Sequence, residues 1–435
     1  MSQFLDAQAK ENGTKFLIYP QNKKLKGFEQ PELIYINLPP GSIQAGPEDE
    51  KMYVVDAKNK QEYRFVGEGP PYQGLRFPPV QSNEEGHFDH IRPDTQAFSS
   101  TVMYATVRRV LDIWEDYFGH SIQWYFHKDF DKLELIPRVE WDNAHSGYGF
   151  LEFGFGRNSD RSIDHSNPYC ENFDVLAHEM GHTIKNSTIG WPENKKDETR
   201  EYRGHHESFG DLVAIVSVMH FDSVINHILK NTKGNLFSVN ELSRMGELSQ
   251  SREIRMAFNN KKISDVDSPS EEHMLSEPFT GGAFDILVEV FQHNLIERGF
   301  VSKELGKRAY HAKGTELEAV QNEFNQCYQG KEADFKEALL DARDYFGKLM
   351  AKAWSNTSCN NLSYGKVLNN IIEADRELNE GKYKQTILDC FDWREIVPAV
   401  DDSRMLLNTH IVDELVAFSA AGEMGPEDFL NTKYL

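Results

Sequence analysis

The chain has 435 residues and a formal net charge of −22 at pH 7, with 39% hydrophobic and 27% charged residues. This composition is typical of folded globular proteins and excludes a disordered or fibrous chain. The negative charge repels polyanions, so we expect neither nucleic acid nor anionic membrane as a partner. The longest apolar run, at 212–221, is far shorter than the roughly 18 residues that a membrane span needs.

The length exceeds that of most single hydrophobic cores, so we expect more than one domain. The N-terminal residues show no basic start followed by an apolar stretch, which predicts no secretory signal. The four cysteines are widely separated, as in reduced cytoplasmic proteins. We therefore expect a cytoplasmic protein and leave export by another route open.

In chain order, residues 1–95 are expected to be rich in β-structure, with a hairpin formed by "MYVVDA" and "EYRFVG". Helical spacing of apolar residues predicts a helix from Ser99 to Phe118, ended by Gly119. Three strands are then predicted in "SIQWYF", "LELIPRVEW" and "GYGFLEFGFG". From about residue 172 the pattern is mainly helical.

This order of elements predicts an α+β fold, with a β-rich N-terminal domain followed by a mainly α-helical domain. We expect three regions: a β-rich domain with one long helix at 1–168, a helical domain at 169–345, and a helical extension at 346–435. The junction of the first two regions is the expected place for the chemistry.

The segment "NFDVLAHEMGHTIKNS", residues 172–187, contains His178, Glu179 and His182. Histidines four residues apart share one helix face and can bind one Zn(II) ion, with the glutamate beside them. A catalytic zinc needs a third protein ligand and an open position, and Glu207 in "HHESFGDLVA" is the predicted third ligand. Asp211, one turn further, is predicted to accept the free ring N–H of a zinc-bound histidine.

The alternative is that the two histidines are chance neighbours in a packed helix. A pattern this short arises by accident in roughly one chain in twenty of this length and composition. The apolar helix around it, and the second helix with Glu207 and Asp211 four apart, favour the zinc interpretation. We predict one zinc ion per chain.

Beyond the motif, the sequence resembles the thermolysin-like branch of the gluzincin metallopeptidases over about residues 95–345. "DVLAHEMGH" is similar to the active-site helix of that family, and "HESFGDLVA" to the helix with its third ligand and supporting aspartate. The resemblance implies a thermolysin-like architecture, with the active site at the domain junction, and a zinc metallopeptidase that hydrolyses peptide or protein substrates.

The resemblance implies further site residues. "DNAHSGYGFLEFGFG" looks like the substrate-binding edge strand of the family, with Asn143 and Ala144 as peptide-binding residues. His273 stands where the family has its transition-state histidine. Arg255 is similar to the arginine that binds the carbonyl beside the scissile bond, although an ordinary surface arginine is the alternative.

The sequence also departs from the family pattern. The region after His182, where the family has a catalytic tyrosine, reads "GWPENKKDE", and Tyr202 is the predicted substitute. Asp174 matches a calcium ligand of the family, but no acidic partners are evident. We therefore favour a helix N-terminal role for Asp174 over calcium binding.

The predicted mechanism uses Glu179 as the general base that activates a zinc-bound water. Two alternatives remain from the sequence: a zinc hydrolase that acts on a non-peptide amide, and a catalytically silent gluzincin-like binding protein. Glu179 argues against the second, because a structural zinc site needs no general base. The sequence predicts neither cleavage specificity nor oligomeric state.

Overall fold

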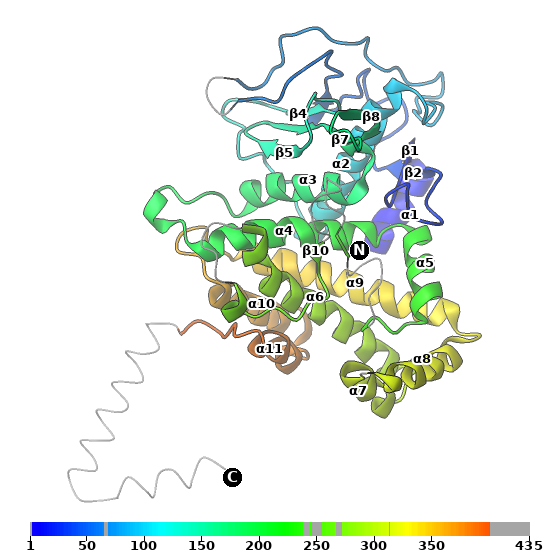
Figure 1. Ribbon diagram of the computed structural model, residues 1–435, viewed down its shortest axis with the longest axis vertical. Coiled ribbons are helices and arrows are strands. Elements are labelled where there is room, and N and C mark those ends of the chain that lie inside the picture. The colour runs from blue at the N-terminus through cyan, green and yellow to red at the C-terminus, as the bar shows by residue number, and fades with distance from the viewer. Residues whose placement is uncertain are drawn as a thin grey trace, which may run out of the picture. The chain divides into compact units, whose positions relative to one another are not determined.

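Most strands gather at one end of the described structure, and most helices fill the rest (Figure 1). The computed structural model describes residues 2–64, 68–237, 244–245, 255–266, 272–312 and 314–400. Met1–Val397 forms one compact unit by its internal contacts. The α+β fold class is confirmed, because a sheet-rich N-terminal part precedes a helical C-terminal part. The division at 168 and 345 stays a prediction.

The largest sheet has four strands in the order β3-β4-β6-β5, with β3 and β4 parallel, β4 and β6 parallel, and β5 and β6 antiparallel. Two-stranded antiparallel ribbons pair β1 with β2, β7 with β8, and β9 with β10. The strands are β1 (Thr14–Ile18), β2 (Glu32–Ile36), β3 (Met52–Val54), β4 (Leu133–Ile136), β5 (Ala144–Gly147), β6 (Phe150–Phe153), β7 (Phe155–Arg157), β8 (Ile163–Pro168), β9 (Arg244–Met245) and β10 (Arg255–Met256).

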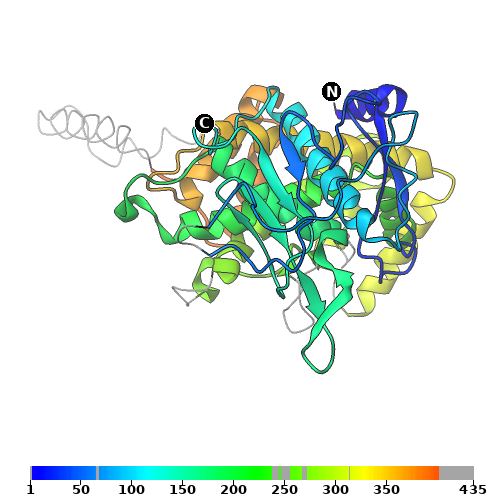
Figure 2. The same cartoon turned by 90° about the horizontal axis from the view of Figure 1, so that it is seen from above.

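The described α-helices are α1 (Ser2–Asn12), α2 (Gln96–Phe118), α3 (Phe173–Thr188), α4 (Arg200–Val218), α5 (Asp222–Thr232), α6 (Glu272–Glu297), α7 (Lys303–His311), α8 (Thr315–Tyr328), α9 (Glu332–Ser355), α10 (Tyr364–Asn379) and α11 (Lys384–Asp392). Seen from the strand-bearing side, the strands lie over the helices (Figure 2). Below the sheet in Figure 1, helix α3 lies first and helix α4 lies under it. Helices α6 and α9 lie on the far side of α4.

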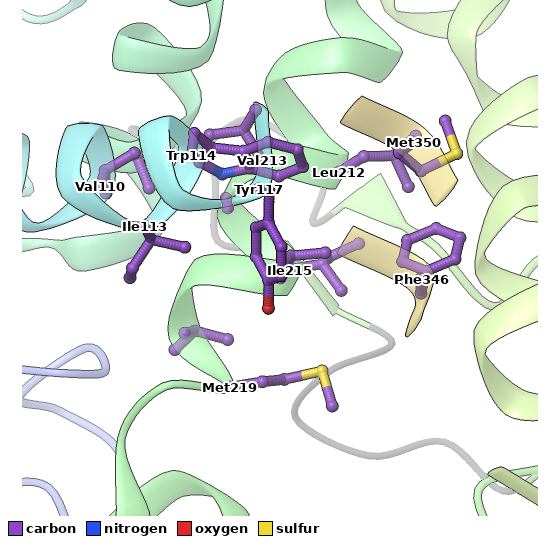
Figure 3. Packing of buried hydrophobic residues seen from close by; sticks show 14 of the residues in the cluster. Val110, Ile113, Trp114, Tyr117, Leu212, Val213, Ile215, Met219, Phe346 and Met350 are labelled. Atoms are coloured by element: carbon purple, nitrogen blue, oxygen red, sulfur yellow. The ribbon is translucent and has the colours of Figure 1, made fainter. Parts of the chain in front are cut away.

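Helix α2 forms a central part of the core. The prediction of this helix is confirmed, and it ends at Gly119, whose φ of 76° is left-handed. The fully buried Trp114 indole donates to Ser217 on α4 and packs against Trp354 on α9, with ring centroids 5.1 Å apart. Figure 3 shows apolar side chains of α2, α4 and α9 meeting at this point. This packing anchors α4, one of the two helices that carry the predicted zinc ligands.

Two glycines allow α3 and α4 to cross closely. A Cβ atom added to Gly181 on α3 would lie 2.7 Å from Cα of Gly210 on α4. A Cβ atom at Gly210 would lie 2.7 Å from Nδ1 of His178. Small residues at a helix crossing let the backbones approach, so the side chains around the crossing meet at short range.

Two predicted strands are not formed. Residues 121–126 form turns and irregular backbone rather than a strand, and the second hairpin arm is not a strand over residues 62–64; its remaining residues 65–67 lie outside the described part of the chain. Instead, β3 pairs with β4, which is distant in sequence. The backbone N–H of Tyr63 donates to the buried carboxylate of Glu152 at 2.6 Å, so a side chain takes the place of a strand partner.

Among the described residues, no single helix is long and apolar enough to cross a membrane. Helices α4 and α5 together meet the length and composition criteria of a membrane span, but the chain bends by 92° between them.

Candidate metal centre

Helix α3 holds the first three residues of the candidate site. The Asn172 side chain caps the helix by accepting from the backbone N–H of Asp174, which lies in the first turn. The predicted helix N-terminal position of Asp174 is therefore confirmed. His178, Glu179 and His182 are all buried, and one ligand atom of each lies within 4.8 Å of the others. The three residues form a site that could hold a metal ion.

Helix α4 brings Glu207 to the two histidines. Its carboxylate oxygens lie 3.4 Å from Nε2 of His178 and 3.6 Å from Nε2 of His182. Ligands about 2.0–2.2 Å from a tetrahedral ion are separated from one another by roughly 3.3–3.6 Å. The two distances from Glu207 match the separation of ligands at a tetrahedral ion, and the identity of the ion stays a prediction.

The predicted partner of His178 is also in place. Asp211, 1% exposed, has its Oδ1 atom 3.0 Å from Nδ1 of His178. A carboxylate at this nitrogen selects the tautomer with the proton on Nδ1 and leaves Nε2 free to bind a metal. The close crossing at Gly210 gives the His178 ring the room to adopt this position.

Glu179 lies between the helix and the sheet. Burial raises the pKa of Glu179 above its ordinary value, and the nearby His178 opposes that rise. The Ser146 hydroxyl pairs with the Thr183 hydroxyl at 2.9 Å, which ties β5 to α3. This contact places β5 next to the helix that carries Glu179.

The strand that contains Ala144 is an edge strand in the described part of the molecule. β5 is the terminal strand of the four-stranded sheet and pairs with β6 alone within that sheet. Asn143 directly precedes it, and the Asn143 carbonyl accepts from the Gly154 amide at 2.9 Å. The edge position of β5 is confirmed among the described strands, and the peptide-binding role of Asn143 and Ala144 stays a prediction.

His273 lies beside the same carboxylate. Its Nε2 atom is 3.3 Å from Oε2 of Glu207, and its side chain is 47% exposed. The structure therefore joins a residue 66 positions after Glu207 to the cluster, at its solvent-facing side. Its role toward a transition state stays a prediction.

The structure describes the two other predicted residues to different extents, and the Tyr202 ring lies 6.5 Å from the His206 ring, centroid to centroid. The side chain of Arg255, whose backbone lies in β10, is outside the described part of the chain. Tyr202 is 2% exposed, its hydroxyl donates to the Gly190 carbonyl at 3.0 Å, and the Lys185 ammonium lies 3.6 Å from its ring centroid. These contacts favour a packing role for Tyr202 over the predicted oxyanion role.

The sequence interpretation missed two histidines. His206 stacks on His182, and an atom of His206 belongs with His182 and Glu207 to a second group within 4.8 Å. His145 on β5 pairs with the fully buried Glu152 through Nε2 at 2.7 Å. The adjacent pair "HH" before Glu207 was a visible signal, but helical spacing alone does not place His206 on the face of Glu207.

Searches with family models and among curated proteins found no match for this chain. A search of solved structures found a similarity to the precursor of protealysin, a metalloproteinase from Serratia proteamaculans. The TM-score is 0.47 at 10% sequence identity, over 79% of this chain and 87% of that chain.

Proposed function

We propose that the protein is a zinc-dependent hydrolase of peptide bonds. The observation that carries this proposal is the position of the Glu207 carboxylate, 3.4 and 3.6 Å from Nε2 of His178 and His182, with Glu179 in the same cluster. Two imidazoles and one carboxylate are a common ligand set of catalytic zinc, because they leave a fourth position open. Among the described residues, this site contains no cysteine of the kind that closes structural zinc sites.

The donor chemistry of the site fits zinc. Imidazole nitrogen and carboxylate oxygen suit this ion, and the Asp211 carboxylate at Nδ1 of His178 fixes the tautomer that binding requires. When bound, zinc would supply a Lewis acid and lower the pKa of a coordinated water towards about 7.

Glu179 acts as general base in the proposed reaction. Its carboxylate takes one proton from a water molecule while the water oxygen bonds to the carbonyl carbon of the substrate. Glu179 then delivers this proton to the amide nitrogen as the C–N bond breaks, which yields a carboxylic acid and an amine.

The chain offers two further groups to the substrate. His273, half exposed and 3.3 Å from Glu207, can donate to the carbonyl oxygen as negative charge develops there. The free edge of β5 can pair with an extended peptide through main-chain hydrogen bonds. This edge supports a peptide over a small non-peptide amide as substrate.

The test is cleavage of an unbiased peptide library by the zinc-loaded protein and by its Glu179→Gln variant. We expect the wild type to cleave, and the variant to bind zinc and lose cleavage. Glu140→Gln, which changes a carboxylate paired with the exposed His165, is the control that keeps activity. Zinc-loaded wild type that cleaves no peptide contradicts the proposal, as does equal cleavage by wild type and Glu179→Gln.

A further inference from the structure

His206 lies against the candidate metal centre and has no role in the reaction described so far. It precedes Glu207 on α4, and its ring stacks on His182 with centroids 4.1 Å apart and planes 26° apart. On another side, the exposed indole of Trp191 lies 5.9 Å from it, centroid to centroid. His206 thus stands between a predicted zinc ligand and an aromatic residue at the surface.

The stacking limits what His206 can do. A zinc ion lies about 2.0–2.1 Å from the nitrogen that binds it, in the plane of that imidazole. Nearly parallel rings direct their in-plane nitrogens side by side rather than toward one point, so an ion bound by His182 lies well out of the plane of His206. His206 is therefore poorly placed to bind that same ion. A group that approaches the ion from the open side can still come within hydrogen-bonding reach of His206.

The polar state of His206 supports a donor role. Its Nε2 atom is buried and has no hydrogen-bond partner among the described residues. An atom of His206 also lies within 4.8 Å of ligand atoms of His182 and Glu207, so the ring is within reach of the candidate metal position. An imidazole ring carries at least one N–H donor, and a buried polar atom without a partner costs stability that a hydrogen bond to a bound group would recover.

We propose that His206 donates a hydrogen bond to the carbonyl oxygen of the substrate as that oxygen becomes negatively charged. His206 would act from the side of the candidate metal centre on which His182 lies. This inference rests on the proposed function. It assigns to His206 the donor role that the contacts of Tyr202 do not support. His273, beside Glu207, and His206, beside His182, would then approach the same oxygen from two elements.

Two substitutions separate this role from its alternatives. His206→Phe keeps an aromatic ring against His182 and removes both nitrogens, whereas His206→Gln keeps an N–H donor without the ring. His205→Leu is the matched control, because the neighbouring His205 is fully buried between Phe209 and Phe279. Each protein is measured for zinc affinity by chelator competition, for thermal unfolding, for kcat and KM, and for binding of a phosphoramidate peptide, whose anionic oxygens mimic the tetrahedral state.

For His206→Phe we expect zinc affinity within about threefold of wild type and unfolding at the same or a higher temperature, because an unsatisfied polar atom is removed. We expect kcat to fall by about 10²–10³-fold with little change in KM, and phosphoramidate affinity to fall by a similar factor. His206→Gln should recover part of both losses, and His205→Leu should keep both values.

Other outcomes overturn the proposal. A fall of tenfold or more in zinc affinity makes His206 a metal ligand, and unchanged kcat and phosphoramidate affinity leave it a packing residue. If the wild type cleaves no peptide, the proposed function fails, but binding of the phosphoramidate peptide still tests the role of His206. Weaker phosphoramidate binding by His206→Phe than by the wild type, at equal zinc content, then supports the donor role. Equal binding by the two proteins, or no binding by either, rejects it.

Discussion

Oδ1 of Asp211 lies 3.0 Å from Nδ1 of His178, and Nε2 of the same ring lies 3.4 Å from the Glu207 carboxylate. One imidazole therefore joins two carboxylates that stand four residues apart on α4. The first fixes the tautomer of His178, and the second shares the candidate metal position with it.

We predict that Asp211→Asn lowers zinc affinity by roughly 10–100-fold without unfolding the protein, because the ring of His178 loses its charged partner. Chelator competition followed by zinc release measures the affinity, and circular dichroism monitors the fold. Asp94→Asn, which changes a carboxylate that is 64% exposed, should leave the affinity unchanged. Equal affinities of the Asp211 variant and wild type would show that Asp211 has no influence on the metal.

We predict that Gly210→Ala destabilises the protein by about 1–3 kcal/mol and weakens zinc binding, because its Cβ would lie 2.7 Å from Nδ1 of His178. Urea unfolding of the metal-free protein gives the first effect, and zinc titration gives the second. Ser208→Ala, which removes an unpartnered buried hydroxyl from the same helix, is the control with little change. Wild-type values for Gly210→Ala would reject the close crossing of α3 and α4.

Lys185 predicts a dependence of stability on pH. It is fully buried, its ammonium has no hydrogen-bond partner among the described residues, and burial lowers its pKa to about 7. Between pH 7 and its unfolded pKa near 10.5, the unfolded chain holds a proton that the folded chain has released. The cost of burying this amine is therefore greatest at or below pH 7 and falls as the pH rises.

Lys185→Met should accordingly stabilise the protein at pH 7 by a few kcal/mol, since each pKa unit corresponds to about 1.4 kcal/mol. The gain should shrink to roughly half at pH 9. Thermal unfolding of both proteins at the two pH values measures it, with the exposed Lys195→Met as control. A gain that is absent at pH 7, or that grows with pH, would contradict the lowered pKa of the buried Lys185.

The buried pair of Lys60 and Glu152 predicts a large effect on stability. Nζ of Lys60 lies 2.6 Å from Oε2 of Glu152, with side chains 4% and 0% exposed. Lys60→Met leaves a buried carboxylate without its cation and should cost about 3–5 kcal/mol in urea unfolding. Lys132→Met removes a pair with Glu48 of the same 2.6 Å length whose side chains are 32% and 40% exposed, and should cost at most about 1 kcal/mol. Similar losses of unfolding free energy in the two variants would mean that burial does not make the pair of Lys60 and Glu152 more important for stability than an exposed pair.

The grouping of the candidate metal ligands was predictable in part, because its signals are local or periodic. His178 and His182 are four apart, as are Glu207 and Asp211, so each pair shares a helix face by geometry alone. The contact of Nδ1 of His178 with Asp211 then follows once the two helices cross. What the sequence did not reveal is the crossing itself, which depends on Gly181 and Gly210.

The errors lie where tertiary contacts decide the structure. The expected strand at 121–126 is apolar, but Trp124 and Phe126 are buried by turns without strand pairing. The oxyanion role of Tyr202, chosen by its place in the sequence, stays a prediction, and its hydroxyl donates to the Gly190 carbonyl. Stacking between α3 and α4 brings His206 to the site, and no spacing rule within one helix predicts such a contact.

The central claim is that His178, His182 and Glu207 hold one zinc ion. Zinc K-edge X-ray absorption of the zinc-loaded protein tests it directly, with Glu207→Gln measured beside the wild type. We predict one tightly bound zinc with two imidazole ligands and oxygen ligands at about 2.0–2.2 Å, and a changed shell with weaker binding in the variant. A wild type without tightly bound zinc, or a spectrum and affinity that Glu207→Gln leaves unchanged, would contradict the claim.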